Sequence, residues 1–96
     1  MNFKQANKLA EFLNGLSSET RGKILYFVGN KEYSVNEICD GIDEKQSYVS
    51  QQLRILYEKE YLIKKKIGTK VLYRVKNQKI LDILNDIADY VVSENK

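Results

Sequence analysis

Two short amphipathic segments flank a glycine-containing turn near the middle of the chain. The first begins at Ser34, and its spacing to Glu37 is the S-x-x-E capping box that opens a helix. We expect this helix to stop at Gly41. A second box, Asp43 followed by Gln46, is expected to open the next helix. Two helices joined by a tight turn predict a helix-turn-helix, which constrains the fold more than any other feature of the sequence.

The second of these helices has an outer face unlike that of an ordinary surface helix. Apolar residues at helical spacing give it a buried face of Val49, Leu53 and Leu56. The remaining positions hold mostly small and amide side chains, where a solvated face would alternate Glu and Lys. Gln can pair with adenine, and Ser or Tyr can donate to phosphates or base acceptors. The predicted DNA-facing residues are Gln46, Ser47, Tyr48, Ser50, Gln51 and Arg54.

A basic β-hairpin is predicted directly after the helix-turn-helix. Residues 62–67 and 70–75 are β-prone runs on either side of Gly68 and Thr69, which favour a tight turn. Seven cations and no acid lie between Lys64 and Lys79, although the net charge is only +3. A lysine run alone is usually solvated surface, but beside a helix-turn-helix it indicates a contact with a polyanion. The predicted DNA-facing residues of this wing are Lys64, Lys65, Lys66 and Lys70.

The order of predicted elements defines the fold class. A helix over residues 4–16 precedes a second helix that Ser18 caps and Gly29 ends, and a last helix covers residues 77–93. We therefore predict one winged helix-turn-helix domain over residues 1–96, mainly α with a small β-hairpin (α+β). It would contain about five helices and a two-stranded wing.

The first and last helices carry more apolar surface than one small core needs. The alternative is that these stripes only cover the core of the monomer. We expect a symmetric homodimer instead, which would place two recognition helices roughly 34 Å apart, one turn of DNA. The predicted interface consists of Leu9, Phe12, Leu16, Ile80, Ile83, Ile87, Tyr90 and Val91.

The composition excludes several classes of function. The chain has no His and one Cys, so nitrogen–sulfur metal sites, disulfides within the chain and the commonest general base are not expected. We predict no enzyme activity, no catalytic residue, no metal and no cofactor. Cys39 is expected in the core, with a single-thiol redox switch as the alternative. No apolar run approaches the ~20 residues that span a bilayer, so we expect a cytoplasmic protein without a membrane partner.

Three stretches of the chain resemble ArsR/SmtB-type repressors. They are FLNGLSSETRGKILYFV, EYSVNEICDGIDEKQSYVSQQLRIL and KEYLIKKKIGTKVLYRV, and the resemblance runs from about Leu9 to Val75. It implies a homodimeric winged-helix repressor that leaves DNA when an inducer binds, and it favours Ser47, Tyr48, Ser50 and Gln51 as the DNA contacts. The retained signature residues are Arg21, Ile24, Leu25, Val49, Ser50, Leu53, Leu56, Gly68 and Tyr73.

The departures from the family pattern concern metal sensing. Ser34 and Asn36 stand where metal-sensing members carry two cysteines, and Gln52 replaces a His, a change expected to affect operator preference. The resemblance therefore transfers DNA binding and dimerisation to this chain but leaves any inducer unknown. The last helix offers only carboxylates, which favour hard ions and bind them weakly unless pre-arranged: Asp82, Asp86, Asp89 and Glu94.

Three functions are compatible with these features. The leading prediction is a sequence-specific regulator, a repressor, that binds a palindromic operator in double-stranded DNA as a homodimer. A winged-helix module for protein–protein contacts would show no salt-dependent DNA affinity. An accessory protein that binds nucleic acid non-specifically would show the salt dependence but little preference between duplexes.

Overall fold

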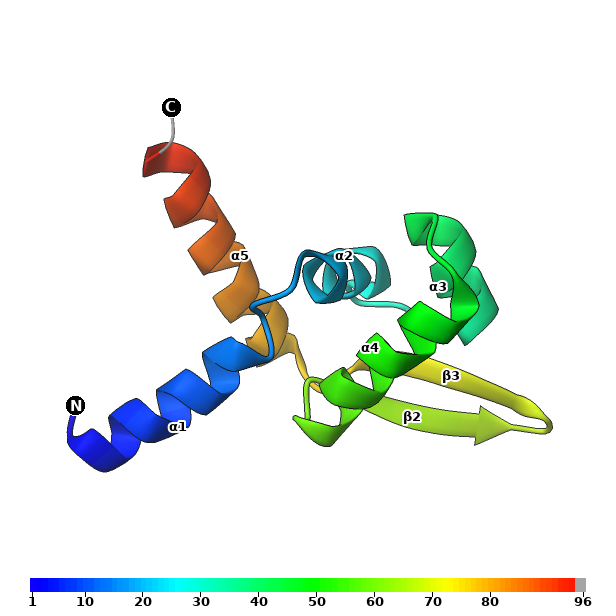
Figure 1. Cartoon of the computed structure of the whole chain (residues 1–96), viewed down its shortest axis with the longest axis horizontal. Helices are drawn as coiled ribbons and strands as arrows, with labels where there is room; N and C mark the ends of the chain where they lie inside the picture. The colour runs from blue at the N-terminus through cyan, green and yellow to red at the C-terminus, as the bar shows by residue number, and fades with distance from the viewer. Residues whose placement is uncertain (95–96) are drawn as a thin grey trace.

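The computed structural model describes residues 1–94 and has a winged helix-turn-helix architecture (Figure 1). Its α2, α3 and α4 helices form the body, from which α1 and α5 project on one side and the β2–β3 hairpin on the other. The elements in chain order are α1 (Phe3–Asn14), α2 (Glu19–Val28), β1 (Glu32–Tyr33), α3 (Val35–Ile42), α4 (Gln46–Glu58), β2 (Leu62–Ile67), β3 (Lys70–Val75) and α5 (Gln78–Glu94).

The predicted fold class is confirmed, with one strand added to the wing. The sheet is antiparallel and has the order β1-β3-β2. The short strand β1 pairs Glu32 with Arg74 and Tyr33 with Tyr73. Strand β1 is only two residues long, too short to show an alternation of buried and exposed side chains. Its partner strand lies about forty residues further along the chain, so the sequence pattern did not indicate β1.

Local capping signals account for the starts of the first three helices. Asn2 and Gln5 form a capping box at α1, and the Ser18 side chain accepts a hydrogen bond from the Arg21 N–H at α2. The predicted box of Ser34 and Glu37 opens α3. The Glu37 carboxylate accepts a hydrogen bond from the Ser34 backbone N–H, which lowers the pKa of this carboxyl.

The predicted turn between α3 and α4 was wrong in detail. Helix α3 continues through Gly41 to Ile42 and ends at Asp43, which adopts the left-handed conformation and donates its N–H to the Cys39 carbonyl. Asp tolerates this conformation better than most residues. The N-cap of α4 is Lys45, so Asp43 and Gln46 form no capping box. Gly41 is needed for packing, because the Phe27 ring occupies the space of a β-carbon there.

The core lies where α2, α3 and α4 meet the base of the hairpin. Cys39 is buried in this core as predicted, and burial raises the pKa of its thiol. Tyr61 is also fully buried and packs against Phe12 in a tilted ring contact, with ring centroids 4.8 Å apart. The buried core residues are Ile24, Leu25, Val28, Ile38, Cys39, Val49, Leu53, Leu56, Tyr61, Leu62, Val75 and Ile80.

Candidate nucleic-acid interface

Helix α4 separates its buried and exposed faces as the sequence predicted. The side chains of Val49, Leu53 and Leu56 are fully buried against the body. The six predicted DNA-facing residues of this helix, including Ser50 and Gln51, are exposed. The structure thus brings them together on one accessible surface, which we call the α4 face: Gln46, Ser47, Tyr48, Ser50, Gln51 and Arg54.

The start of α4 adds backbone donors to the α4 face. Within residues 1–94, the side chain of its N-cap residue Lys45 makes no capping hydrogen bond to the helix. The first-turn N–H groups therefore remain available to an acceptor, and phosphates commonly bind at such helix starts. Arg54 pairs with Glu58 at 2.9 Å, but both side chains are exposed, so this ion pair is weak enough to exchange for a phosphate contact.

The strand pairing divides the wing lysines between two faces. Lys64 lies opposite Tyr73 and Lys66 opposite Val71, which places both on the core-side face of the hairpin. The Lys64 ammonium lies 4.1 Å from the centroid of the Tyr57 ring, at the end of α4. A cation–π contact of this kind holds Lys64 close to the body. The sequence treated the wing lysines as one strip, because it did not show which strand face meets the helices.

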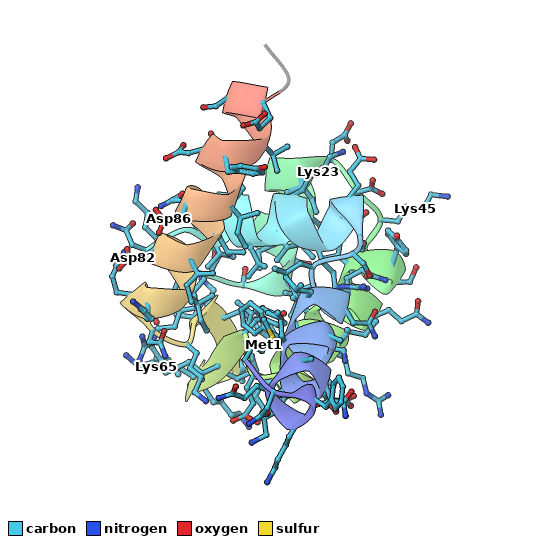
Figure 2. The ribbon with its side chains drawn as sticks, turned by 90° about the vertical axis from the view of Figure 1, so that its left-hand side faces the viewer. Met1, Lys23, Lys45, Lys65, Asp82 and Asp86 are labelled. Carbon is cyan, nitrogen blue, oxygen red and sulfur yellow. The ribbon has the colours of Figure 1, made fainter. Side chains whose placement is uncertain are left out.

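The opposite face of the wing contains Lys65, Lys70 and Arg74. Arg74 was not among the predicted DNA-facing residues, although strand alternation places it on the same face as Lys65. Its partner on the neighbouring strand β1 is Glu32, whose negative charge partly offsets the positive charge of Arg74. Figure 2 shows Lys65 extending away from the body beside the hairpin, and Lys45 extending outward at the other edge of the view. All four predicted wing lysines are exposed.

Gln52, which stands where the family pattern has a His, lies away from the α4 face. Its side chain is only 7% exposed, and its Oε1 accepts a hydrogen bond of 2.8 Å from the Arg21 Nη1. An effect of this residue on operator preference therefore cannot come from an exposed base contact. Helical spacing could have indicated its position, because Gln52 follows the buried Val49 by three residues.

The terminal helices leave most of their apolar surface exposed. No residue of α1 is buried, and Ile80 is the buried residue of α5. Ile80 is 8% exposed and belongs to the core, so it is removed from the predicted interface. Leu16 lies in the connection after α1, because that helix ends at Asn14. Of the other predicted interface residues, Phe12, Leu16 and Ile83 are half-buried, while Leu9, Ile87, Tyr90 and Val91 are exposed.

An apolar groove of about 580 Å³ lies between α2 and α5. Leu25, Leu81, Leu84 and Ile87 line it together with Tyr26. Tyr26 is 91% exposed and was not among the predicted interface residues. Because α5 contributes Leu81, Leu84 and Ile87 to its lining, the groove extends the apolar surface of the terminal helices.

Across residues 1–94, no three His, Cys, Asp or Glu side chains lie together in a way that could hold a metal ion. The Ser34 hydroxyl caps α3 by accepting a hydrogen bond from the Glu37 N–H. Asp82 and Asp86 project outward from α5 at the edge of the molecule in Figure 2. In the same range, no helix is long and apolar enough to cross a membrane.

The chain is similar to known transcription regulators. Residues 18–64 match the family described as bacterial regulatory protein, arsR family. The transcriptional repressor SmtB homolog of Synechocystis sp. is 25% identical over 91 residues, which cover 95% of this chain and 69% of that protein. These proteins are regulators and not enzymes, which agrees with the predicted absence of enzyme activity.

Solved structures support the same fold. The crystal structure of the transcriptional repressor BigR from Xylella fastidiosa has a TM-score of 0.81 and 28% identity, covering 91% of this chain and 89% of that one. A winged helix-turn-helix DNA-binding domain from Mycobacterium bovis, described as homodimeric in solution, has a TM-score of 0.82. Its identity is 18%, with 99% of this chain and 90% of that one covered, so this second likeness concerns the fold alone.

Proposed function

We propose that this chain, whose residues 18–64 match the arsR family of bacterial regulatory proteins, is a repressor that binds a palindromic operator as a homodimer. The observation that carries this proposal is the α4 face: small and amide side chains lie exposed beside a lysine-rich wing. A major groove about 12 Å wide admits an α-helix, and Gln and Ser reach base edges there. The wing lysines would then contact the phosphate backbone.

The homodimer in this proposal is supported by the exposed terminal helices. Helix α1 has no buried residue in the single chain, and α5 has one. Both helices project from the same side of the body, away from the wing (Figure 1). A two-fold axis on that side would leave both α4 faces accessible, and the related Mycobacterium bovis domain is described as homodimeric.

We treat residues 1–96 as one DNA-binding domain within this proposal. The regions predicted as residues 4–16 and 77–93 supply the dimer contact, and the α4 face and wing supply the DNA contact. A regulator of this kind would act on DNA in the cytoplasm.

Two single substitutions test the assigned DNA surface. Gln51→Ala is expected to reduce discrimination at one base-pair position by about 1–3 kcal/mol, because it removes a base-edge contact. Lys65→Ala is expected to weaken all duplexes about equally and to lower the salt slope by about one, because it removes one phosphate contact. Fluorescence anisotropy measures both effects at several salt concentrations. It uses duplexes that the wild-type protein selects from a random pool, and scrambled duplexes for comparison. If neither substitution changes binding to any duplex, the assigned surface is wrong.

A further inference from the structure

The side chain of Arg21 joins three helices. Its Nε donates to the Gly15 carbonyl at 2.8 Å, and its Nη2 donates to the Asn14 carbonyl at 3.3 Å. Both acceptors lie at the C-terminal end of α1, where a cation is favoured and unpaired carbonyls need donors. Its Nη1 donates to Gln52 in α4 at 2.8 Å, while Arg21 itself lies in the first turn of α2.

Gln52 is the part of this junction that belongs to the recognition helix. Gln52 is only 7% exposed, so water does not readily replace the guanidinium as the partner of its amide. Loss of one partner from a buried hydrogen bond leaves the other group unsatisfied, which costs more than a surface hydrogen bond. The bond between Arg21 and Gln52 therefore resists rotation of α4 relative to the end of α1.

Helix α1 has few other attachments to the body. Gly15 lies directly against the Tyr61 ring, which occupies the space of a β-carbon there, and the Phe12 ring packs against the same ring at a tilt. No residue of α1 is fully buried. The angle at which α1 leaves the body therefore depends on one small junction, formed by Arg21, Gln52 and Tyr61 around the end of the helix.

We propose that Arg21 and Gln52 are positioning residues that set the spacing of the two half-sites accepted by the dimer. The proposal rests on the proposed function, because α1 is assigned to the dimer contact and α4 to the DNA contact. It gives Gln52 an effect on operator preference without any contact between Gln52 and DNA. The effect would act through the orientation of each α4 relative to the two-fold axis.

A small change of angle is enough to alter the spacing. A helix of twelve residues such as α1 is about 18 Å long. A tilt of roughly 10° over that length moves its far end by about 3 Å, close to the ~3.4 Å rise of one base pair. Loosening the junction would thus let the dimer accept half-sites one base pair closer or further apart.

The test compares Gln52→Leu with Gln52→Glu in the full chain. Leu is similar in size and favours a helix but cannot accept the bond from Arg21, whereas Glu keeps an acceptor oxygen at that place. The duplexes carry the selected half-sites at the selected spacing and at one base pair more or less. Wild type and Gln52→Glu are expected to bind the duplex with the selected spacing about 10-fold or more tightly than the duplexes with altered spacing. For Gln52→Leu this ratio of affinities is expected to be less than about 3-fold. Base preference within each half-site is expected to stay unchanged in all three.

Arg21→Lys provides a second route if Gln52→Leu does not fold by circular dichroism. Lys keeps the charge at the end of α1 but lacks the planar fork that bonds both helices at once, so spacing preference is expected to fall in the same way. Retention of the full spacing preference by a folded Gln52→Leu or Arg21→Lys protein would overturn the proposal. A wild-type protein that prefers no duplex at all would instead overturn the proposed function.

Discussion

Ile87→Asp is expected to convert the dimer to a monomer and to weaken operator binding by about 100-fold or more. Ile87 is 41% exposed on α5 and lines the groove between α2 and α5, on the surface assigned to the dimer. Burying an unpaired carboxylate in an apolar interface is strongly unfavourable. A monomer then binds with one recognition helix and loses the gain from joining two binding sites. Sedimentation velocity at micromolar concentration measures the mass, and fluorescence anisotropy measures the operator affinity.

The matched control is Asp86→Asn, which changes the charge of the adjacent residue. Asp86 projects outward from α5 (Figure 2), so this variant should sediment and bind as the wild type does. If Ile87→Asp still sediments as a dimer, the assigned interface is wrong. A wild-type protein that sediments as a monomer at this concentration would contradict the homodimer itself.

Leu53→Ala is expected to lower the free energy of unfolding by about 2–5 kcal/mol. The Leu53 side chain is fully buried where α4 meets the core, and its truncation leaves a cavity that close-packed neighbours fill only in part. Urea denaturation followed by circular dichroism measures the loss. Ile67→Ala is the control, because Ile67 is 52% exposed at the wing tip and should cost no more than about 0.5 kcal/mol. Equal stability of the two variants would contradict the position of Leu53 in the core.

The parts of the fold predicted correctly depend on short-range chemistry. The cap of α2 at Ser18 and the box of Ser34 and Glu37 are signals within one helical turn, and both are found in the structure. The hairpin follows from two β-prone runs around Gly68, which has a positive φ of 62°. The buried face of α4 follows from helical periodicity, which packing against the core satisfies.

The parts that were missed depend on contacts between distant residues. Strand β1 exists because Glu32 and Tyr33 find partners in β3. Gly41 stays within α3 because the Phe27 ring packs against it, so a residue type typical of helix ends does not end this helix. Tertiary contacts of this kind outweigh local preference, and no pattern within one segment reveals them.

The sequence predicted which residue types form the candidate site, but it did not predict how the structure arranges them. The chemistry of the α4 face could be read from the sequence, and all its residues are exposed. The division of the wing between Lys64 and Lys65 required the strand register and the position of Tyr57. The junction between Arg21 and Gln52 joins residues thirty-one positions apart, so only the folded chain brings them together.

The most direct test of the proposed repressor is selection of bound fragments from random duplexes, followed by affinity measurements with wild-type protein. A palindromic site is expected to be bound about 10³-fold or more tightly than a scrambled duplex at physiological salt. The affinity is also expected to fall steeply as salt increases, because the wing lysines release counterions from the phosphates. Equal affinity for selected and scrambled duplexes would contradict sequence-specific regulation, and binding that does not depend on salt would contradict the assigned DNA surface.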